Sequence, residues 1–209
     1  MVESNKNEME QLKKIFFLGT VNAQYHPMEG IDERLTELLT DFKVTAFRDS
    51  KVLEPSKLKD CTVFILYREF NLPALTEDET AALLTYVAEG GALFVLHNGI
   101  SVQGKSELSQ LIGAKFTGHP PYDTLPEIFY HREQPSHPIF TGVSDFKMYD
   151  EAYQFEMDSF ADKEILLSYD FEGSRVPAGW VRGYGKGRML YLCCGHNKEC
   201  FFNTEFSRI

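Results

Sequence analysis

The sequence has no run of about 20 apolar residues, the length that a helix needs to cross a bilayer. Residues 1–11 are polar and charged, and they lack the apolar segment of a secretory signal. Basic residues are also scarce, because 21 Lys and Arg stand against 31 Asp and Glu and give a net charge of −10. Nucleic acids and anionic membranes both attract basic surfaces. We therefore expect a cytoplasmic protein that binds neither nucleic acid nor membranes.

Cysteine is rare, with four residues in a chain of 209, and none of them forms a Cys-x-x-Cys motif. Cys61, Cys193 and Cys194 lie in apolar runs, where cysteine acts as a small hydrophobic residue. Cys200 lies in a polar stretch. Because the ligand spacing of a cysteine zinc site is absent, the sequence argues against such a site.

Internal repeats and low-complexity linkers are absent too, so we predict a single domain over residues 1–209. The apolar fraction of 43%, which includes 13% aromatic residues, is sufficient for a sizeable core. The composition therefore predicts a globular chain and excludes a disordered one.

The first half of the chain alternates strands with helices. Short apolar runs predict strands at 14–19, 42–47, 61–67 and 92–96. Apolar residues at helical spacing predict helices at 31–39, 76–88 and 101–111, the second of which begins with a Thr76–Glu79 capping box. This rhythm is typical of right-handed parallel crossovers, so the predicted fold class is α/β with a parallel sheet.

The second half is richer in strands, which we predict at 127–131, 146–149, 164–169, 178–184 and 188–194. Glycines at 183, 185 and 187 indicate a hairpin turn between the last two strands. They do not form a phosphate loop, because they do not open a helix after a strand. We therefore expect β-hairpins in addition to the parallel sheet.

Polar residues follow several of these strands, and ligands bind at the carboxyl ends of strands in parallel sheets. The strand at 92–96 ends in His97-Asn98-Gly99, and His26 lies in the loop after the first strand. His196 follows the last strand, and an acidic pair, Asp150-Glu151, precedes Tyr153.

Several stretches resemble the ThuA-like (trehalose utilisation) family, which is itself similar to class I glutamine amidotransferase-like domains. They are GALFVLHNG at 91–99, IGAKFTGHP at 112–120, HPIFTGV at 137–143 with DEAY at 150–153, and PAGWVRGYGKGR at 177–188 with Gly195-His196 after it. The resemblance implies a three-layer flavodoxin-like fold with extra β-hairpins and a role near carbohydrate metabolism. Amidotransferases carry a cysteine at the elbow after this strand, where the chain has His97. Because glutamine hydrolysis needs that thiolate, we expect no glutaminase activity.

We expect His97, Glu151 and His196 to be catalytic, because imidazole and carboxylate groups together serve acid–base catalysis or hold a divalent metal. Around them we expect substrate-binding residues, namely His26, Asn98, Asp150, Tyr153, Trp180 and Arg182. Trp180 would stack on a sugar ring, and Arg182 would add hydrogen bonds.

Structural interpretations compete with these roles. Trp180 is also consistent with a core aromatic, which is the commoner fate of a large aromatic residue. Asp150-Glu151 is also consistent with a solvated loop pair, and His196 with a surface residue. His131 lies in an alternating strand, which favours a structural role, and His137-Pro138 favours a turn. His119-Pro120-Pro121 is consistent with the rim of a pocket.

Two functions stay open at this point. The first is an enzyme that acts on a sugar or sugar derivative, including a keto-sugar, and the second is a non-catalytic ligand-binding or regulatory domain. A third hypothesis, an interaction module, would use Phe201-Phe202 or Pro120-Pro121-Tyr122. The expected partner is a carbohydrate-type small molecule. The cofactor is undetermined, with a divalent metal as one alternative, and a homo-oligomer is not excluded.

Overall fold

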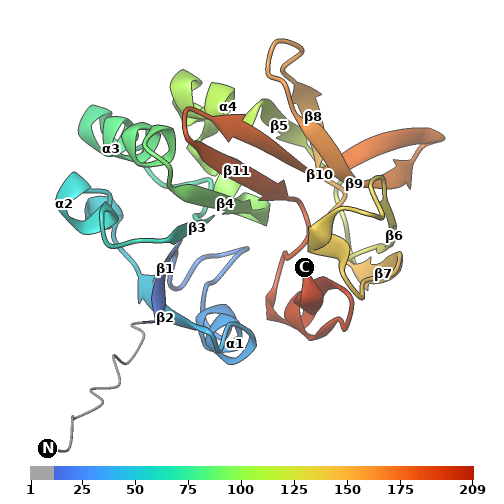
Figure 1. Ribbon diagram of the computed structural model, residues 1–209. Coiled ribbons are helices and arrows are strands. Elements are labelled where there is room, and N and C mark those ends of the chain that lie inside the picture. The colour runs from blue at the N-terminus through green and yellow to red at the C-terminus, as the bar shows by residue number, and fades with distance from the viewer. Residues whose placement is uncertain (1–11) are drawn as a thin grey trace, which may run out of the picture.

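The computed structural model describes residues 12–209, so residues 1–11, where we expect no secretory signal, lie outside this range. Its main feature is a nine-stranded sheet with strand order β2-β1-β3-β4-β11-β10-β9-β6-β7 (Figure 1). The first five strands in this order are parallel: β2 (Phe42–Phe47), β1 (Lys13–Gly19), β3 (Val63–Tyr67), β4 (Ala92–Leu96) and β11 (Gly187–Leu192). This is the strand order of a flavodoxin-like sheet, as predicted.

Helices cover both faces of the parallel strands. On one face α3 contacts both α2 and α4, and on the other α1 contacts the C-terminal 3-10 turn η4, which in turn contacts η5 (Figure 1). Their bounds are Ile31–Leu38 for α1, Pro55–Leu58 for α2, Glu77–Ala88 for α3, Ser106–Ile112 for α4, Lys198–Phe202 for η4 and Phe206–Arg208 for η5. β3 is consequently buried at four of its five residues, which explains its continuous apolar sequence. The predicted three-layer α/β fold is confirmed.

Helix α3 begins as its sequence predicts. The Thr76 hydroxyl accepts a hydrogen bond from the Glu79 N–H at 3.2 Å, and the Glu79 carboxylate accepts one from the Thr76 N–H at 2.8 Å. These two bonds satisfy backbone donors that have no partner within the helix. The helix ends at Ala88, just before Gly90, whose φ of +124° suits glycine.

The second half of the chain extends the same sheet with antiparallel strands. They are β6 (Glu127–Arg132), β7 (Phe146–Tyr149), β9 (Glu164–Phe171) and β10 (Ser174–Tyr184). The predicted hairpin turn joins β10 to β11, with Gly185 at φ +59°. Two strands were not predicted, β5 (Ala114–Gly118) and β8 (Gln154–Met157), which pair with each other outside the main sheet. Both are short and mix polar with apolar residues, so their hydrophobic pattern is weak.

The segment after β4 differs from the single helix predicted at 101–111. A 3-10 helix, η2, runs over His97–Gly104, and α4 begins only at Ser106. Lys105 between them is extended, with φ −98° and ψ 122°, and interrupts the helix. The residue before it is Gly104, whose conformational freedom disfavours a continuous helix.

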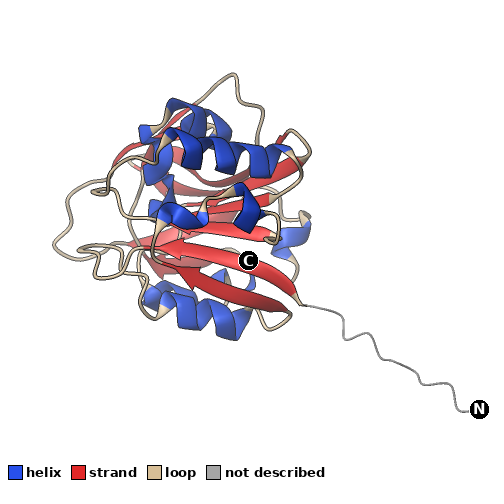
Figure 2. Ribbon diagram, turned by 90° about the vertical axis from the view of Figure 1, so that its left-hand side faces the viewer, coloured by secondary structure: helices blue, strands red, loops and turns tan. Residues whose placement is uncertain are grey.

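The carboxyl ends of β1, β3, β4 and β11 all lie at one edge of the sheet, because these strands are parallel. Long loops gather at that edge, on the left-hand side of Figure 2. All four cysteines are buried and free of disulfides. Within residues 12–209, every helix is too short or too polar to span a membrane. Ligands bind at this edge in parallel sheets, so these loops are the expected location of a functional site.

Candidate functional site

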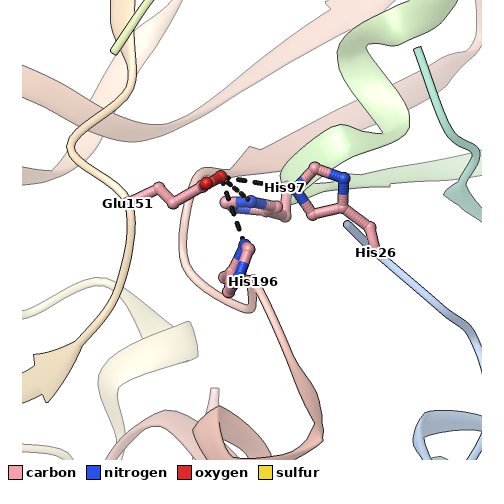
Figure 3. Close-up of side chains that lie close together, drawn as sticks. All are labelled: His26, His97, Glu151 and His196. Atoms are coloured by element: carbon pink, nitrogen blue, oxygen red, sulfur yellow. Dashed lines mark hydrogen bonds and ion pairs between the residues drawn. The ribbon is translucent and has the colours of Figure 1, made fainter. Parts of the chain in front are cut away.

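Three histidines and a glutamate converge at the carboxyl edge of the parallel strands (Figure 3). His26 comes from the loop after β1, His97 directly follows β4, and His196 follows β11. Glu151 reaches the same point from the loop between β7 and β8. One potential ligand atom from each residue lies within 4.8 Å of the other three. The structure therefore brings together the three residues predicted as catalytic and adds His26 to them.

The Glu151 carboxylate lies at the centre of this cluster. Its Oε2 atom is 3.2 Å from His97 Nε2, 3.3 Å from His26 Nε2 and 3.2 Å from His196 Nδ1. Burial would raise the pKa of Glu151, but the three histidines outweigh it and hold the pKa well below its ordinary value. Glu151 is only 7% exposed, so it is not part of a solvated loop pair.

His97 occupies the elbow after β4 with an unusual backbone, at φ +45°, in the left-handed region that is rare for residues other than glycine. Its side chain is fully buried, and its Nδ1–H donates to the Cys193 carbonyl oxygen at 2.5 Å. Burial lowers the pKa of His97, which favours the neutral imidazole. The elbow residue is therefore a buried imidazole held by a backbone carbonyl oxygen.

Glu69 is a residue of the candidate site that the sequence reasoning missed. Its carboxylate oxygens both lie 3.2 Å from His26 Nδ1, and one of them also accepts from the His26 backbone N–H at 3.1 Å. Burial alone would lower the pKa of His26, but the hydrogen bonds that its ring donates to the Glu151 and Glu69 carboxylates raise it overall. A signal was present, because Glu69 lies two residues past β3, at the same edge as His26 and His97.

The pairing of Glu69 with His26 predicts an acid-dependent loss of stability. Burial would raise the pKa of Glu69, but bonds and charge from His26 lower it from 4.5 to about 2. The ionised Glu69 carboxylate therefore contributes its full stabilisation of the folded state above pH 4.5. This contribution, on the order of 3 kcal/mol, is lost as the pH falls toward 2. Urea unfolding of chelator-treated protein from pH 7 to pH 3 should show it. The difference between wild type and Glu69→Gln should shrink with falling pH, and a constant difference would contradict the pairing.

Asp150 binds the backbone of two residues of the cluster, Glu151 and His196. Its buried carboxylate accepts hydrogen bonds from the backbone N–H groups of Gly195 at 2.9 Å, Glu151 at 2.8 Å and His196 at 3.3 Å. The Tyr67 hydroxyl binds the same turn, 2.9 Å from the Gly195 carbonyl oxygen. Asp150 thus joins the loop that carries Glu151 to the turn that carries His196, and it acts as a positioning residue.

A cavity of about 670 Å³ opens above the cluster and includes Glu151, His26 and His196 in its lining. Its wall contains stacked rings, because His119 lies nearly parallel to Tyr122 and Tyr153, with interplanar angles of 8° and 9°. The His119 ring is partly exposed, and its Nε2 lies 3.6 Å from Glu151 Oε1. His119, which the sequence places at a pocket rim, therefore faces both the cluster and the cavity.

Four residues predicted to bind substrate do not line this cavity, which corrects those predictions; they are the buried Asp150 described above, Trp180, Arg182 and Asn98. Trp180 is fully buried and donates to the Ile112 carbonyl oxygen at 2.8 Å, so its face packs in the core. Arg182 lines a separate cavity and donates to the Gln110 carbonyl oxygen. Asn98 is buried beneath the elbow and does not line the cavity. Both Trp180 and Arg182 lie on β10, which is antiparallel to β11. Arg182 pairs with Met189, away from the carboxyl end of β11, whereas Trp180 pairs with Tyr191 near that end and is kept from the cavity by its burial.

The structural interpretations of two other histidines are confirmed. His131 pairs with Asp170 at 3.1 Å on the antiparallel strands. His137 begins the short turn η3 (Pro138–Phe140), where its Nδ1 accepts from the Ile139 N–H at 3.3 Å. Neither lies in the cavity above the cluster.

The cluster offers three imidazole nitrogens and a carboxylate oxygen at the floor of a cavity. Groups of this kind can transfer protons, and the same four residues have the donor atoms of a metal site. Sequence-distant loops supply all of them, which is typical of sites at the carboxyl edge of a parallel sheet.

Comparisons with known proteins agree with this architecture. The family model for ThuA, described as trehalose utilisation, matches residues 5–209. A ThuA-like protein from Bacteroides uniformis has a TM-score of 0.77 at 19% identity, with 99% of this chain and 91% of that chain covered. A ThuA-like protein from Parabacteroides merdae has a TM-score of 0.74 at 15% identity, covering 94% and 86%. No curated protein matches.

A third structural neighbour is part of a larger enzyme. The GH42 β-galactosidase Gan42B of G. stearothermophilus has a TM-score of 0.63 at 16% identity, covering 93% of this chain and 28% of that one. At these identities the solved structures establish the fold alone. The family model, in contrast, spans nearly the whole sequence. The protein therefore belongs to the ThuA (trehalose utilisation) family.

Proposed function

We propose that this protein is an enzyme that transfers protons on a carbohydrate or sugar derivative, with keto-sugars as the preferred class. The observation that carries the proposal is the position of His119, stacked between tyrosine rings in the cavity and 3.6 Å from the buried Glu151 carboxylate. The family description, trehalose utilisation, supports a carbohydrate.

The cavity suits a sugar in size and in lining. Its volume of about 670 Å³ lies within the roughly 300–1,000 Å³ typical of small-molecule sites. Aromatic faces such as that of Tyr122 pack against the apolar face of a sugar ring, while its hydroxyl groups need polar partners. Glu151 and His196 supply such partners at the floor.

His119 has the hydrogen bonding of a general base. A carbonyl oxygen can only accept, so the 2.8 Å bond from Nδ1 to the Pro120 carbonyl oxygen places a proton on Nδ1. This leaves Nε2 as the ring nitrogen that can accept a proton from a substrate. A carbon beside a carbonyl group is the acidic position of a keto-sugar, so enolisation, epimerisation or elimination would use such a base.

Glutamine hydrolysis is not part of this proposal. It requires a thiolate at the elbow, and the elbow residue is His97. We therefore expect no release of ammonia from glutamine at any pH from 6 to 9.

The proposal is tested first by ligand binding. Trehalose, glucose and their keto derivatives are screened by thermal shift, because a ligand at 100 times its Kd stabilises the fold by about 2.7 kcal/mol. Any sugar that binds is then incubated with enzyme and its products are followed by NMR in D₂O, which detects exchange of the carbon-bound proton.

His119→Ala should slow that exchange by roughly 10²- to 10⁴-fold, the usual contribution of a general base, while the thermal shift persists. The matched control is His131→Ala, which removes a histidine outside the cavity and should exchange at the wild-type rate. Saturable binding without exchange or product in the wild type would instead favour the second candidate, a non-catalytic sugar-binding domain. No sugar binding at all would overturn both.

A further inference from the structure

The tautomers of two buried histidines are fixed by acceptors on their far sides. The Cys193 carbonyl oxygen and the Glu69 carboxylate can only accept, so His97 and His26 each carry a proton on Nδ1. With only that one proton on each ring, the Nε2 atoms present lone pairs to Glu151 Oε2, at 3.2 Å for His97 and 3.3 Å for His26. Two lone pairs therefore face an oxygen that also carries lone pairs.

His196 adds a third unpaired nitrogen. Its Nδ1 lies 3.2 Å from Glu151 Oε2, but the ring is not oriented for a hydrogen bond. Among residues 12–209 this buried atom has no hydrogen-bond partner. A buried polar atom without a partner costs about 1–3 kcal/mol, and it indicates a bound species that satisfies it.

Protonation of the histidine rings does not stabilise this arrangement of three rings around one carboxylate oxygen well. Hydrogen bonds from all three rings to one oxygen would require His26 and His97 to be doubly protonated cations. Their ring centroids are only 5.0 Å apart, and His97 is fully buried. Two adjacent buried cations repel each other and lose hydration, whereas a single cation at the centre would attract all four groups.

We propose that His26, His97, His196 and Glu151 bind one divalent transition-metal ion. The three separations from Glu151 Oε2, 3.2–3.3 Å, fit this use, because tetrahedral bonds of about 2.0–2.1 Å place neighbouring ligand atoms about 3.3 Å apart. All four ligand atoms lie within 4.8 Å of one another. Three imidazoles and one carboxylate select zinc, manganese, iron or cobalt, whereas magnesium and calcium prefer oxygen ligands.

The surrounding residues have the arrangement that orients metal ligands. Histidines that bind a metal usually donate their other N–H to a carboxylate or a backbone carbonyl. His26 does so to Glu69, and His97 does so to the Cys193 carbonyl oxygen. Asp150 holds the backbone N–H groups of the other two ligands, Glu151 and His196. Each of the four ligands is therefore oriented by a specific partner.

The metal would lie at the floor of the cavity, below His119. If the sugar activity proposed above holds, the ion would polarise a carbonyl or hydroxyl oxygen of the substrate as a Lewis acid. Metal binding itself does not depend on that activity, so the two proposals can fail separately.

The test measures metal binding directly on the full-length protein. Protein is stripped with chelator, dialysed, and titrated with Zn²⁺, Mn²⁺ and Co²⁺ by calorimetry, and the visible absorption of the Co²⁺ form reports nitrogen and oxygen ligands. We expect one equivalent to bind. His97→Asn and His196→Asn should each weaken binding by more than about 100-fold, because loss of a ligand exceeds the roughly 10- to 100-fold cost of losing a partner that orients one.

His131→Asn is the matched control and should bind the metal as wild type does, because His131 pairs with Asp170 outside the cluster. Circular dichroism checks that each variant is folded, and His196→Asn, at a partly exposed position, guards against misfolding of the buried His97 variant. The proposal is overturned if the wild type binds none of the three ions. Equal binding by His196→Asn and His131→Asn would overturn it as well. Metal binding by a protein that shows neither sugar binding nor proton exchange would contradict only the proposed function.

Discussion

Gly99→Ala is expected to destabilise the protein by about 3 kcal/mol or more, at the upper end of the range for overpacked cores. A Cβ atom at this position would lie 2.2 Å from the Leu66 carbonyl oxygen and 2.8 Å from its carbonyl carbon. Leu66 belongs to the central strand β3, so the atoms that would have to move are backbone atoms inside the sheet. The elbow therefore requires glycine two residues after His97.

The midpoint of urea unfolding measures this effect, and Gly104→Ala is its control. Both glycines lie in η2, but a Cβ at Gly104 would meet only the Ala74 Cβ, at 3.9 Å. We expect Gly104→Ala to change the free energy of unfolding by less than about 0.5 kcal/mol. Equal midpoints for the two variants would show that β3 and η2 can separate without cost, contrary to the packing described above.

Asp150→Ala is expected to have the second large effect, on both stability and the cluster. The substitution removes the acceptor for three backbone N–H groups, those of Gly195, Glu151 and His196. The aspartate is fully buried, and each buried donor left without a partner costs about 1–3 kcal/mol. The free energy of unfolding should therefore fall by about 3 kcal/mol or more.

The same substitution should weaken metal binding by roughly 10- to 100-fold, because Asp150 fixes the backbone of two proposed ligands. Calorimetry with Zn²⁺ measures this, at a temperature where circular dichroism shows the variant folded. Asp170→Ala is the control, since Asp170 is an exposed aspartate whose pairs with His131 and Arg175 contribute at most about 1 kcal/mol. Wild-type affinity in Asp150→Ala would show that Asp150 does not position the ligands.

The central strands of the parallel sheet could be predicted from local sequence because they are largely buried on both faces and are therefore continuously apolar. β3 and β4 are examples, and the capping box of α3 is local in the same sense. The strands β5 and β8 could not be predicted, because their stability comes from pairing with each other across about 40 intervening residues. Helix α4 starts later than predicted because η2 continues from the elbow through Gly104.

The site was predicted in part, for a related reason. His26, His97 and His196 follow strands, and the rule that ligands bind at the carboxyl edge applies to each from sequence alone. Glu69 also follows a strand at the carboxyl edge, but it lies in no sequence motif that would single it out. Trp180 was misplaced because an aromatic residue in a strand has the same pattern whether it faces a ligand or the core. Its partner on β11, Tyr191, packs against it in the interior, with ring centroids 4.4 Å apart and the ring planes tilted by 34°.

The sequence by itself determined the α/β class, the family and the edge of the sheet where the site lies. Hydrophobic periodicity and short motifs are local properties, so they can be recognised in the sequence without the tertiary structure. Only the tertiary structure decided which side chains meet. Glu151 comes from a loop 54 residues after His97 and 45 residues before His196, and it reaches both because the antiparallel extension returns the chain to the carboxyl edge. Contacts over such separations depend on the packing of the whole chain, and that packing placed Glu151 among three histidines.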